Sequence, residues 1–176
     1  VGMATYWLMP RLPDFYAQHP DITVNVQAPS SDLPNLSPGI DVAVRYGIGD
    51  WHEGVTHKLF DERVCPVGAP DLVARLQDQG VGLDSAPLIH VRNPHNQHWA
   101  GWEDYLREKG IKRARPSGPT FNNYVQAAQA VLDGRGLMLG WHSISRRAVI
   151  TRVAASIALA PSPISRTCTG APRTST

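Results

Sequence analysis

The chain has 176 residues, of which 42% are hydrophobic and 18% charged, only two are cysteine, and the formal net charge is +2. A chain of this size buries roughly 70% of its unfolded surface in one core or two small lobes, so it needs no disulfide framework. No run of about 20 apolar residues is present, which excludes a transmembrane helix, and the first residues lack the pattern of a signal peptide.

The charge of the chain is unevenly distributed. Residues 1–145 contain 12 Lys and Arg against 15 Asp and Glu, a net charge of −3, whereas residues 146–176 contain five Arg and no acidic residue. The body of the chain therefore does not present the uniformly basic face of a nucleic-acid-binding domain. Cys65 lies among valines, a pattern typical of a small buried thiol, and this fits a reducing cytoplasm.

The first predicted element is an amphipathic helix, and His19-Pro20-Asp21 ends it. Proline breaks a helix interior but is tolerated in a first turn, so Pro10 and Pro13 predict that the regular helix begins close to them. The apolar residues of one helical face are Leu8, Leu12, Phe15 and Tyr16.

Two strands are predicted after this helix. Residues 22–26 alternate apolar and polar side chains, which is the period of a strand with one buried face. Residues 41–46 are mostly apolar and lead into Gly47, as expected for a parallel strand covered on both faces. Strands that bracket helices in this way predict an open α/β sheet, whose ligands bind beyond the carboxyl ends of the strands.

Strands and helices continue to alternate in the middle of the chain. Residues 60–68 are predicted to be extended, and Ala69-Pro70-Asp71 predicts the start of a short helix that ends at Gly80. Residues 88–91 predict a further strand, followed by a helix with apolar residues at 99–106 that Gly110 closes.

A last helix precedes the return of the chain to a sheet. Asn122 or Asn123 is expected to cap it, and its predicted apolar stripe is Val125, Ala128 and Leu132. Gly134 and Gly136 are expected to supply a left-handed exit into a strand at 137–139. Alternation on both sides of residues 64–67 predicts two α/β lobes joined by extended crossings.

Five segments together resemble the effector-binding domain of LysR-type transcriptional regulators, in the subgroup of the glycine-cleavage activator. The resemblance covers about Trp7 to Ser145, and the segments that carry it in order and spacing are residues 7–15, 19–21, 41–47, 66–70 and 129–137. It implies a two-lobed, periplasmic-binding-protein-like α/β fold with a small-molecule site between the lobes. It also implies a winged helix-turn-helix domain upstream that these residues do not contain.

The family pattern also suggests how the chain is divided. We expect residues 1–64 to form the first lobe, 65–139 the second, and 140–145 a return crossing. The first lobe should lack most of its first strand, of which at most Val1 to Thr5 remain. Residues 146–176 form an atypical tail rich in Arg, Ser, Thr, Ala and Pro, which we interpret as the product of a shifted reading frame or a degraded gene. The alternative is a short helix with the apolar stripe Val149, Ile150, Val153 and Ile157.

Candidate effector-binding residues lie where strands end and helices begin, because free N–H groups and the helix dipole favour carboxylates there. For Thr5 and the asparagines the alternative is an ordinary helix cap, and for Trp141 it is a packed aromatic of the hinge. Arg45 either holds an anion or lies on the solvated side of its strand. The candidates are Thr5, Tyr6, Tyr46, Gly47, Phe121, Asn122, Asn123 and Trp141.

Other chemistries have little support in the sequence. The spacing of His90, His95 and His98 matches no zinc pattern, and no Cys or Glu completes a ligand set, so we expect no metal. Trp99 and Trp102 are expected to be contacts between a helix and the core rather than a base-stacking platform. No Gly-x-Ser-x-Gly elbow or phosphate-cradling glycine loop is present, so we predict neither an enzyme nor a cofactor.

The sequence therefore predicts a cytoplasmic domain that senses a small-molecule effector, a carboxylate or an amino acid. The resemblance implies a homodimer or higher homo-oligomer, paired through the helices at 8–16 and 125–132. It implies DNA contact only through the absent domain, and no membrane partner is expected. Two alternatives remain, which are a periplasmic solute-binding protein of the same architecture and a small α/β enzyme acting on a carboxylate.

Overall fold

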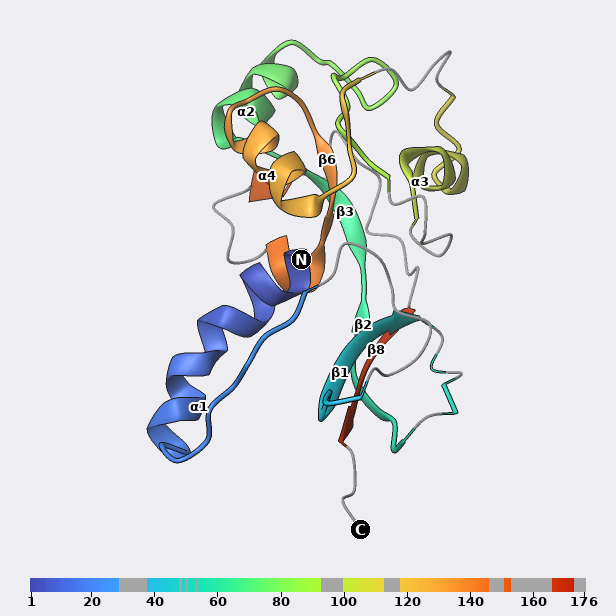
Figure 1. Cartoon of the computed structure of the whole chain (residues 1–176). Helices are drawn as coiled ribbons and strands as arrows, with labels where there is room; N and C mark the ends of the chain where they lie inside the picture. The colour runs from blue at the N-terminus through green and yellow to red at the C-terminus, as the bar shows by residue number, and fades with distance from the viewer. Residues whose placement is uncertain are drawn as a thin grey trace.

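The computed structural model describes residues 1–28, 38–47, 49, 51–52, 54–92, 100–112, 118–145, 151–152 and 166–172. Two groups of elements are separated along the molecule (Figure 1). The upper group contains most of the helices around a three-stranded sheet, called the upper sheet, and a short two-stranded one, and the lower group is a further three-stranded sheet, called the lower sheet. The first helix extends downward beside them from the N-terminus, which lies near the middle of the molecule. This division confirms the predicted α/β architecture with two sheet-containing parts.

The upper part is built on β3 (Val64–Gly68), which pairs antiparallel with β6 (Met138–Trp141) and β7 (Thr151–Arg152). A short parallel pair, β4 (His90–Val91) and β5 (Thr120–Phe121), lies in the same part. Three helices pack around these strands: α2 (Pro70–Asp78), α3 (Trp102–Glu108) and α4 (Tyr124–Leu132).

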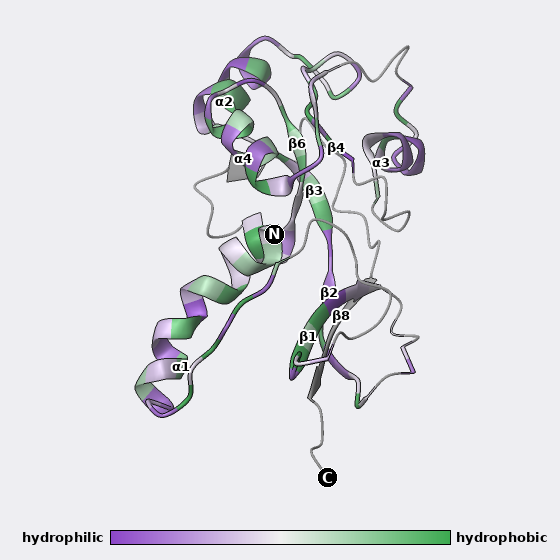
Figure 2. Ribbon diagram, viewed as in Figure 1, coloured by the Kyte–Doolittle hydropathy of each residue, from purple (hydrophilic) through white to green (hydrophobic). Residues whose placement is uncertain are grey.

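Two clusters of buried apolar side chains hold the upper part together. One joins α2 to α3 through residues such as Leu72, Leu76 and Leu106. The other lies between α4 and the strands and contains Ala128 and Met138. Figure 2 shows α2 and α4 with alternating apolar (green) and polar (purple) residues, and β3 as a largely apolar strand. Each fully buried Leu or Met side chain stabilises the fold by roughly 1.5–3 kcal/mol relative to an exposed one.

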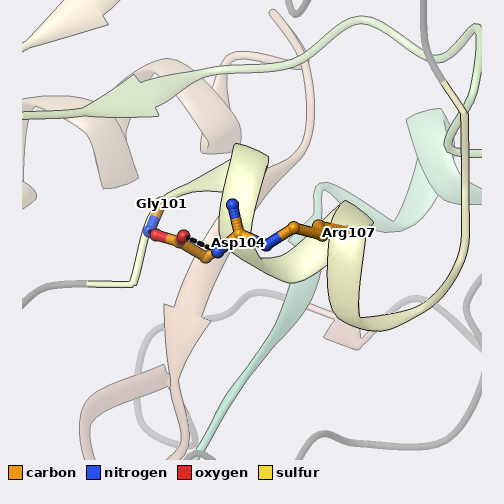
Figure 3. Close-up of polar contacts among 3 residues, drawn as sticks. All are labelled: Gly101, Asp104 and Arg107. Atoms are coloured by element: carbon orange, nitrogen blue, oxygen red, sulfur yellow. Dashed lines mark hydrogen bonds and ion pairs between the residues drawn. The ribbon is translucent and has the colours of Figure 1, made fainter.

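The N-terminus of α3 is stabilised by a single side chain. Asp104 accepts a hydrogen bond from the Gly101 N–H through Oδ2 (3.3 Å) and pairs with Arg107 through Oδ1 (2.5 Å), as Figure 3 shows. On the buried side of the helix, Trp102 Nε1 donates to the carbonyl of Ile89 (2.9 Å). The prediction that Trp102 is a contact between helix and core is therefore confirmed, whereas Trp99 lies outside the described residues.

The lower sheet has the order β1-β8-β2, formed by β1 (Val42–Gly47), β8 (Arg166–Pro172) and β2 (His57–Glu62). Both neighbours pair antiparallel with β8, so the predicted parallel arrangement of the strand at 41–46 is wrong. Val42 and Val44 keep 59% and 40% of their surface exposed, so the strand is not covered on both faces either. A run of apolar residues cannot reveal the direction of a neighbour that comes from the far end of the chain.

Parts of the tail predicted to be atypical, residues 146–176, form strands of both sheets. Residues 166–172 form the central strand of the lower sheet, and Thr151–Arg152 pair with Val67 and Gly68. The apolar residues of the alternative tail helix, at 149, 150, 153 and 157, lie outside the described residues. A frameshift or gene-decay origin of the tail stays a prediction.

The first helix is composed of three kinds of helical turn in succession. A π-helical segment, η1 (Ala4–Leu8), leads into a 3₁₀ turn, η2 (Met9–Arg11), and then into α1 (Leu12–Gln18). The regular α-helix begins close to the prolines, as predicted, because Pro10 and Pro13 each occupy the first turn of their own segment. Helical turns nevertheless precede them from Gly2 onward.

Residues 22–28 carry no regular secondary structure, so the predicted strand at 22–26 is wrong. Ile22 and Val26 are 50% and 39% exposed, and no described strand pairs with this segment. Alternating apolar and polar side chains are compatible with a strand, but a segment becomes part of a sheet only when a neighbouring strand pairs with its backbone N–H and C=O groups.

The remaining predicted elements are confirmed, with one shift of face. Asn123 caps α4, but the buried stripe of that helix is Tyr124, Ala127, Ala128 and Val131. Leu132 of the predicted stripe is 39% exposed. Gly134 has the expected positive φ of 70°, whereas Gly136 is absent from the glycines with positive φ. A Cβ on Gly136 would lie 2.9 Å from the Pro87 carbonyl oxygen, so a close backbone approach explains that glycine.

Within the described ranges, no helix is long and apolar enough to span a membrane.

Candidate functional site

A single residue, Arg63, lies between β2 of the lower sheet and β3 of the upper sheet. Beside this junction runs the end of β6, where Trp141 pairs with Val64, followed by α5 (His142–Ser145). The His142 N–H donates to the Arg63 carbonyl oxygen (2.8 Å). The junction between the two parts of the molecule is thus a pair of adjacent segments far apart in sequence.

Glu62, the last residue of β2, is 1% exposed at this junction. Its Oε1 accepts from the backbone N–H groups of Arg63 (2.9 Å) and Ser143 (3.1 Å), and Oε2 accepts from the Ser143 hydroxyl. Burial raises the pKa of this carboxyl above its ordinary value of 4.5, although the hydrogen bonds from Ser143 and Arg63 oppose the shift. Sequence reasoning missed Glu62. The one indication in the sequence is that Glu62 lies two residues from both Phe60 and Val64, so in an extended segment it shares their apolar face.

Four aromatic side chains form a continuous series next to the junction. Tyr46 of β1 packs on Trp141 with ring centroids 4.7 Å apart. Trp141 packs on Tyr124 of α4 (6.4 Å), and Tyr124 packs edge-on against Tyr6 of η1 (6.2 Å). The structure therefore brings together three predicted site residues, Tyr6, Tyr46 and Trp141, which come from three different elements.

Tyr124 anchors this aromatic series. Its hydroxyl shares a hydrogen bond with Ser145 Oγ (3.0 Å) and accepts one from the Trp141 N–H (3.3 Å). Burial raises the pKa of Tyr124 well above its ordinary value of 10.0, so the hydroxyl stays protonated. Sequence reasoning missed Tyr124 because it assigned the buried face of α4 to Val125 and Leu132.

The predicted residues at the start of α4 have different roles. Asn123 Oδ1 accepts from the Val125 N–H (2.8 Å), which is the capping alternative considered for it. Asn122 is exposed, and Phe121 packs against the buried face of α4. Among these three residues, the exposed side chain of Asn122 is the one most accessible to a ligand.

Thr5 does not cap a helix. It lies inside η1, where its hydroxyl donates to the Val1 carbonyl oxygen (3.2 Å) and its N–H donates to the same oxygen (3.0 Å). The capping alternative considered for Thr5 is therefore wrong, because the helical turns already begin at Gly2. The side chain of Thr5 is exposed.

The end of β1 is closed by a tryptophan. A Cβ on the buried Gly47 would lie 2.9 Å from the Trp51 ring, so only glycine permits this approach. The Arg45 guanidinium lies over the same ring, 5.0 Å from its centroid. Arg45 is thus a partly buried residue stacked on the aromatic face of Trp51.

The described side chains provide aromatic faces, hydroxyls and amides rather than a metal-ligand set. In the parts of the chain that the structure describes, no group of three or more His, Cys, Asp or Glu could hold a metal ion. His95 and His98 lie outside those parts. Such a set of groups suits the binding of a small polar molecule by stacking and hydrogen bonds.

The sequence profile of the LysR substrate binding domain matches residues 1–171. Among curated proteins, the glycine cleavage system transcriptional activator of Escherichia coli (strain K12) is 31% identical over 139 residues, which cover 78% of this chain and 45% of that protein. The HTH-type transcriptional activator AmpR of Pseudomonas aeruginosa is 34% identical over 135 residues, or 76% of this chain and 44% of that protein. The chain thus spans about half the length of the curated relatives that it matches.

Solved structures show the same fold at lower sequence identity. The effector domain of the transcriptional regulator AmpR of Pseudomonas aeruginosa superimposes with a TM-score of 0.73 at 20% identity, covering 100% of this chain and 84% of that one. The AmpR effector-binding domain from Citrobacter freundii gives a TM-score of 0.71 at 19% identity, covering 99% of this chain and 86% of that one. The two-lobed, periplasmic-binding-protein-like α/β fold predicted from the sequence is thereby confirmed.

Proposed function

The chain belongs to the LysR substrate-binding domain family, and on this basis we propose that it binds a small carboxylate or an amino acid at the junction of its two sheets. Binding would be reported to the DNA-binding domain of a LysR-type transcriptional regulator. One observation carries the location of the site: Tyr46 of the lower sheet and Trp141 of the upper sheet are in contact, so a ligand bound against this pair of rings touches both parts at once.

The mechanism is linkage between ligand binding and the arrangement of the two sheets. A ligand that fits one arrangement better than another shifts the population toward it, and typical coupling free energies are about 1–3 kcal/mol. The family consists of transcriptional regulators, and we extend this to the chain itself: its site reports a metabolite and does not transform it. A role at DNA also assigns the regulator to the cytoplasm.

Seven of the predicted site residues remain in this proposal. Tyr6, Tyr46 and Trp141 belong to the aromatic series, and Gly47 ends β1 next to Tyr46. Phe121, Asn122 and Asn123 lead into α4, whose first residue is Tyr124. Thr5 is the weakest of the candidates because it is exposed within η1.

We propose the division of the chain at residues 64 and 65 as well, with 140–145 as the return segment. It is supported by the change of sheet between β2 and β3 at Arg63. One exception concerns the start of the chain, because Met3, Tyr6 and Trp7 pack against the core cluster of α4 and not against the lower sheet alone. The first helix therefore spans the junction.

Two copies of the chain are proposed to pair through the first helix and α4 in antiparallel fashion. Apolar side chains remain exposed on both helices, namely Met9 (51%), Tyr16 (38%) and Leu132 (39%). Pairing would cover them. Sedimentation velocity of the chain, compared with a Met9→Asp variant, tests this proposal, and monomers at all concentrations of the unsubstituted chain would contradict it.

A thermal-shift screen with small carboxylates and amino acids tests the effector site. A bound compound at 100 times its Kd stabilises the fold by about 2.7 kcal/mol, so a true effector raises the melting temperature. The Tyr46→Ala variant should lose this shift, whereas the exposed-site variant Ala74→Ser should keep it. Failure of every compound to stabilise the folded chain would contradict the proposed function.

A further inference from the structure

The junction contains one buried charged group that the proposed effector site does not use. Glu62 is 1% exposed, and both of its carboxylate oxygens accept hydrogen bonds. A buried carboxylate is costly unless it is fully hydrogen-bonded, so its position is strongly determined by its donors. Two of the three donors belong to Ser143, which is 81 residues away in sequence.

The donors tie together segments that belong to different sheets. Glu62 ends β2, a strand of the lower sheet, whereas Ser143 lies in α5, which directly follows β6 of the upper sheet. The neighbouring His142 N–H donates to the Arg63 carbonyl oxygen (2.8 Å), parallel to the contacts of the carboxylate. Any change in the angle between β2 and β6 must therefore stretch or break hydrogen bonds of Glu62.

The same segment also carries the aromatic series. Trp141 is two residues before Ser143, and Ser145, two residues after it, shares the hydrogen bond of the Tyr124 hydroxyl. A displacement of α5 relative to Glu62 thus moves the groups against which Tyr124 and Trp141 pack. The carboxylate and the aromatic series are thus connected through residues 141–145.

We propose that Glu62 is a positioning residue, a clamp on α5 that fixes the angle between the two sheets and thereby the spacing of the effector site. Its relevance to sensing rests on the function proposed above, whereas the clamp itself can be measured without an effector. When the clamp is intact, the two parts hold one relative arrangement. When it is weakened, several arrangements are populated.

The test is a distance distribution between the two parts of the full chain, measured by double electron–electron resonance. Spin labels are attached at His57→Cys of β2 and Gln77→Cys of α2, exposed positions whose elements lie in the lower and upper parts of Figure 1. The native cysteines are replaced by Cys65→Ala and Cys168→Ser. Glu62→Gln keeps the shape of the side chain without its charge, and Ser143→Ala removes only the hydroxyl donor.

Asp104→Ala is the control, because Asp104 is likewise an acidic side chain that accepts a backbone N–H, but its partners Gly101 and Arg107 belong to the start and the body of α3 (Figure 3). We expect Glu62→Gln and Ser143→Ala to replace one narrow distance distribution with a broader one, while Asp104→Ala leaves it unchanged. A loss of stability without broadening would be a merely structural effect and would overturn the proposal.

The two variants keep the outcome decisive. If Glu62→Gln fails to fold, as judged by circular dichroism, an unchanged distribution in Ser143→Ala still overturns the clamp. If no compound stabilises the chain, the proposed function fails, but the distance measurement still tests the clamp. If a compound does stabilise the chain and the distance distribution is unchanged in the variants, the clamp fails and the proposed function stands.

Discussion

The rings of Tyr46 and Trp141 pack with their centroids 4.7 Å apart and an interplanar angle of 38°, and this contact joins β1 of the lower sheet to β6 of the upper sheet. Trp141 also packs against both core clusters of the upper part. Trp141 is therefore a packed aromatic at the junction of the two parts, next to Tyr46, which is proposed to meet the effector.

We predict that this ring contact contributes to stability beyond the area that each residue buries. In a double-mutant cycle of Tyr46→Ala and Trp141→Ala, the coupling energy should be about 0.5–1.5 kcal/mol, the range found for aromatic pairs. Urea unfolding of the four proteins measures it. A coupling energy indistinguishable from zero would mean that the two rings do not stabilise each other.

Removing the hydroxyl of Tyr124 should destabilise the chain by about 1–3 kcal/mol, because Ser145 and the Trp141 N–H lose a buried partner. Tyr124→Phe keeps the ring and its contacts, so the effect isolates the hydrogen bonds. Tyr16→Phe, at a side chain that is 38% exposed, serves as the control and should change the unfolding free energy by less than about 0.5 kcal/mol. Equal unfolding midpoints for the two variants would contradict the prediction.

The cap of α4 should be a measurable part of its stability. Asn123→Ala removes the acceptor of the Val125 N–H and should cost about 1 kcal/mol, the usual effect of losing such a cap. Asn122→Ala, at the adjacent exposed position, should cost less. Chemical denaturation of both variants checks this order, and the reverse order would assign the cap to Asn122.

The carboxyl of Glu62 should make stability depend on pH in a defined direction. Its pKa is raised in the folded state by burial, so the folded chain binds this proton more tightly than the unfolded chain does. The stability linked to this group is fully present below about pH 4.5 and is lost as the pH rises through the folded pKa.

Glu62→Gln cannot titrate, so its unfolding free energy should lack this loss. The difference between the unsubstituted chain and the variant should shift in favour of the variant as the pH rises above 4.5, measured by urea unfolding at a series of pH values. Two curves that stay parallel across this interval would show that Glu62 does not titrate with folding.

Much of the fold is encoded in local patterns. The apolar spacing of α2, the cap at Asn123 and the left-handed Gly134 each depend on residues a few positions apart, so the sequence alone determined these elements. The combination of five segments also determined the family, which the match over residues 1–171 confirms. For the proposed site, the sequence pointed to Tyr6, Tyr46 and Trp141 of the aromatic series but not to Tyr124, nor to the buried Glu62 nearby.

Only the tertiary structure decided the features that depend on residues far apart in the sequence, namely strand pairing and the burial of Glu62. Residues 22–26 alternate like a strand but lack a paired strand among the described residues, while β1 acquires an antiparallel neighbour from residues 166–172. Glu62 becomes a buried acceptor only because Ser143 is brought beside it. Periodicity reports which side of a segment is apolar, whereas strand direction, hydrogen-bond partners and the desolvation of a charge depend on what the rest of the chain places against that segment.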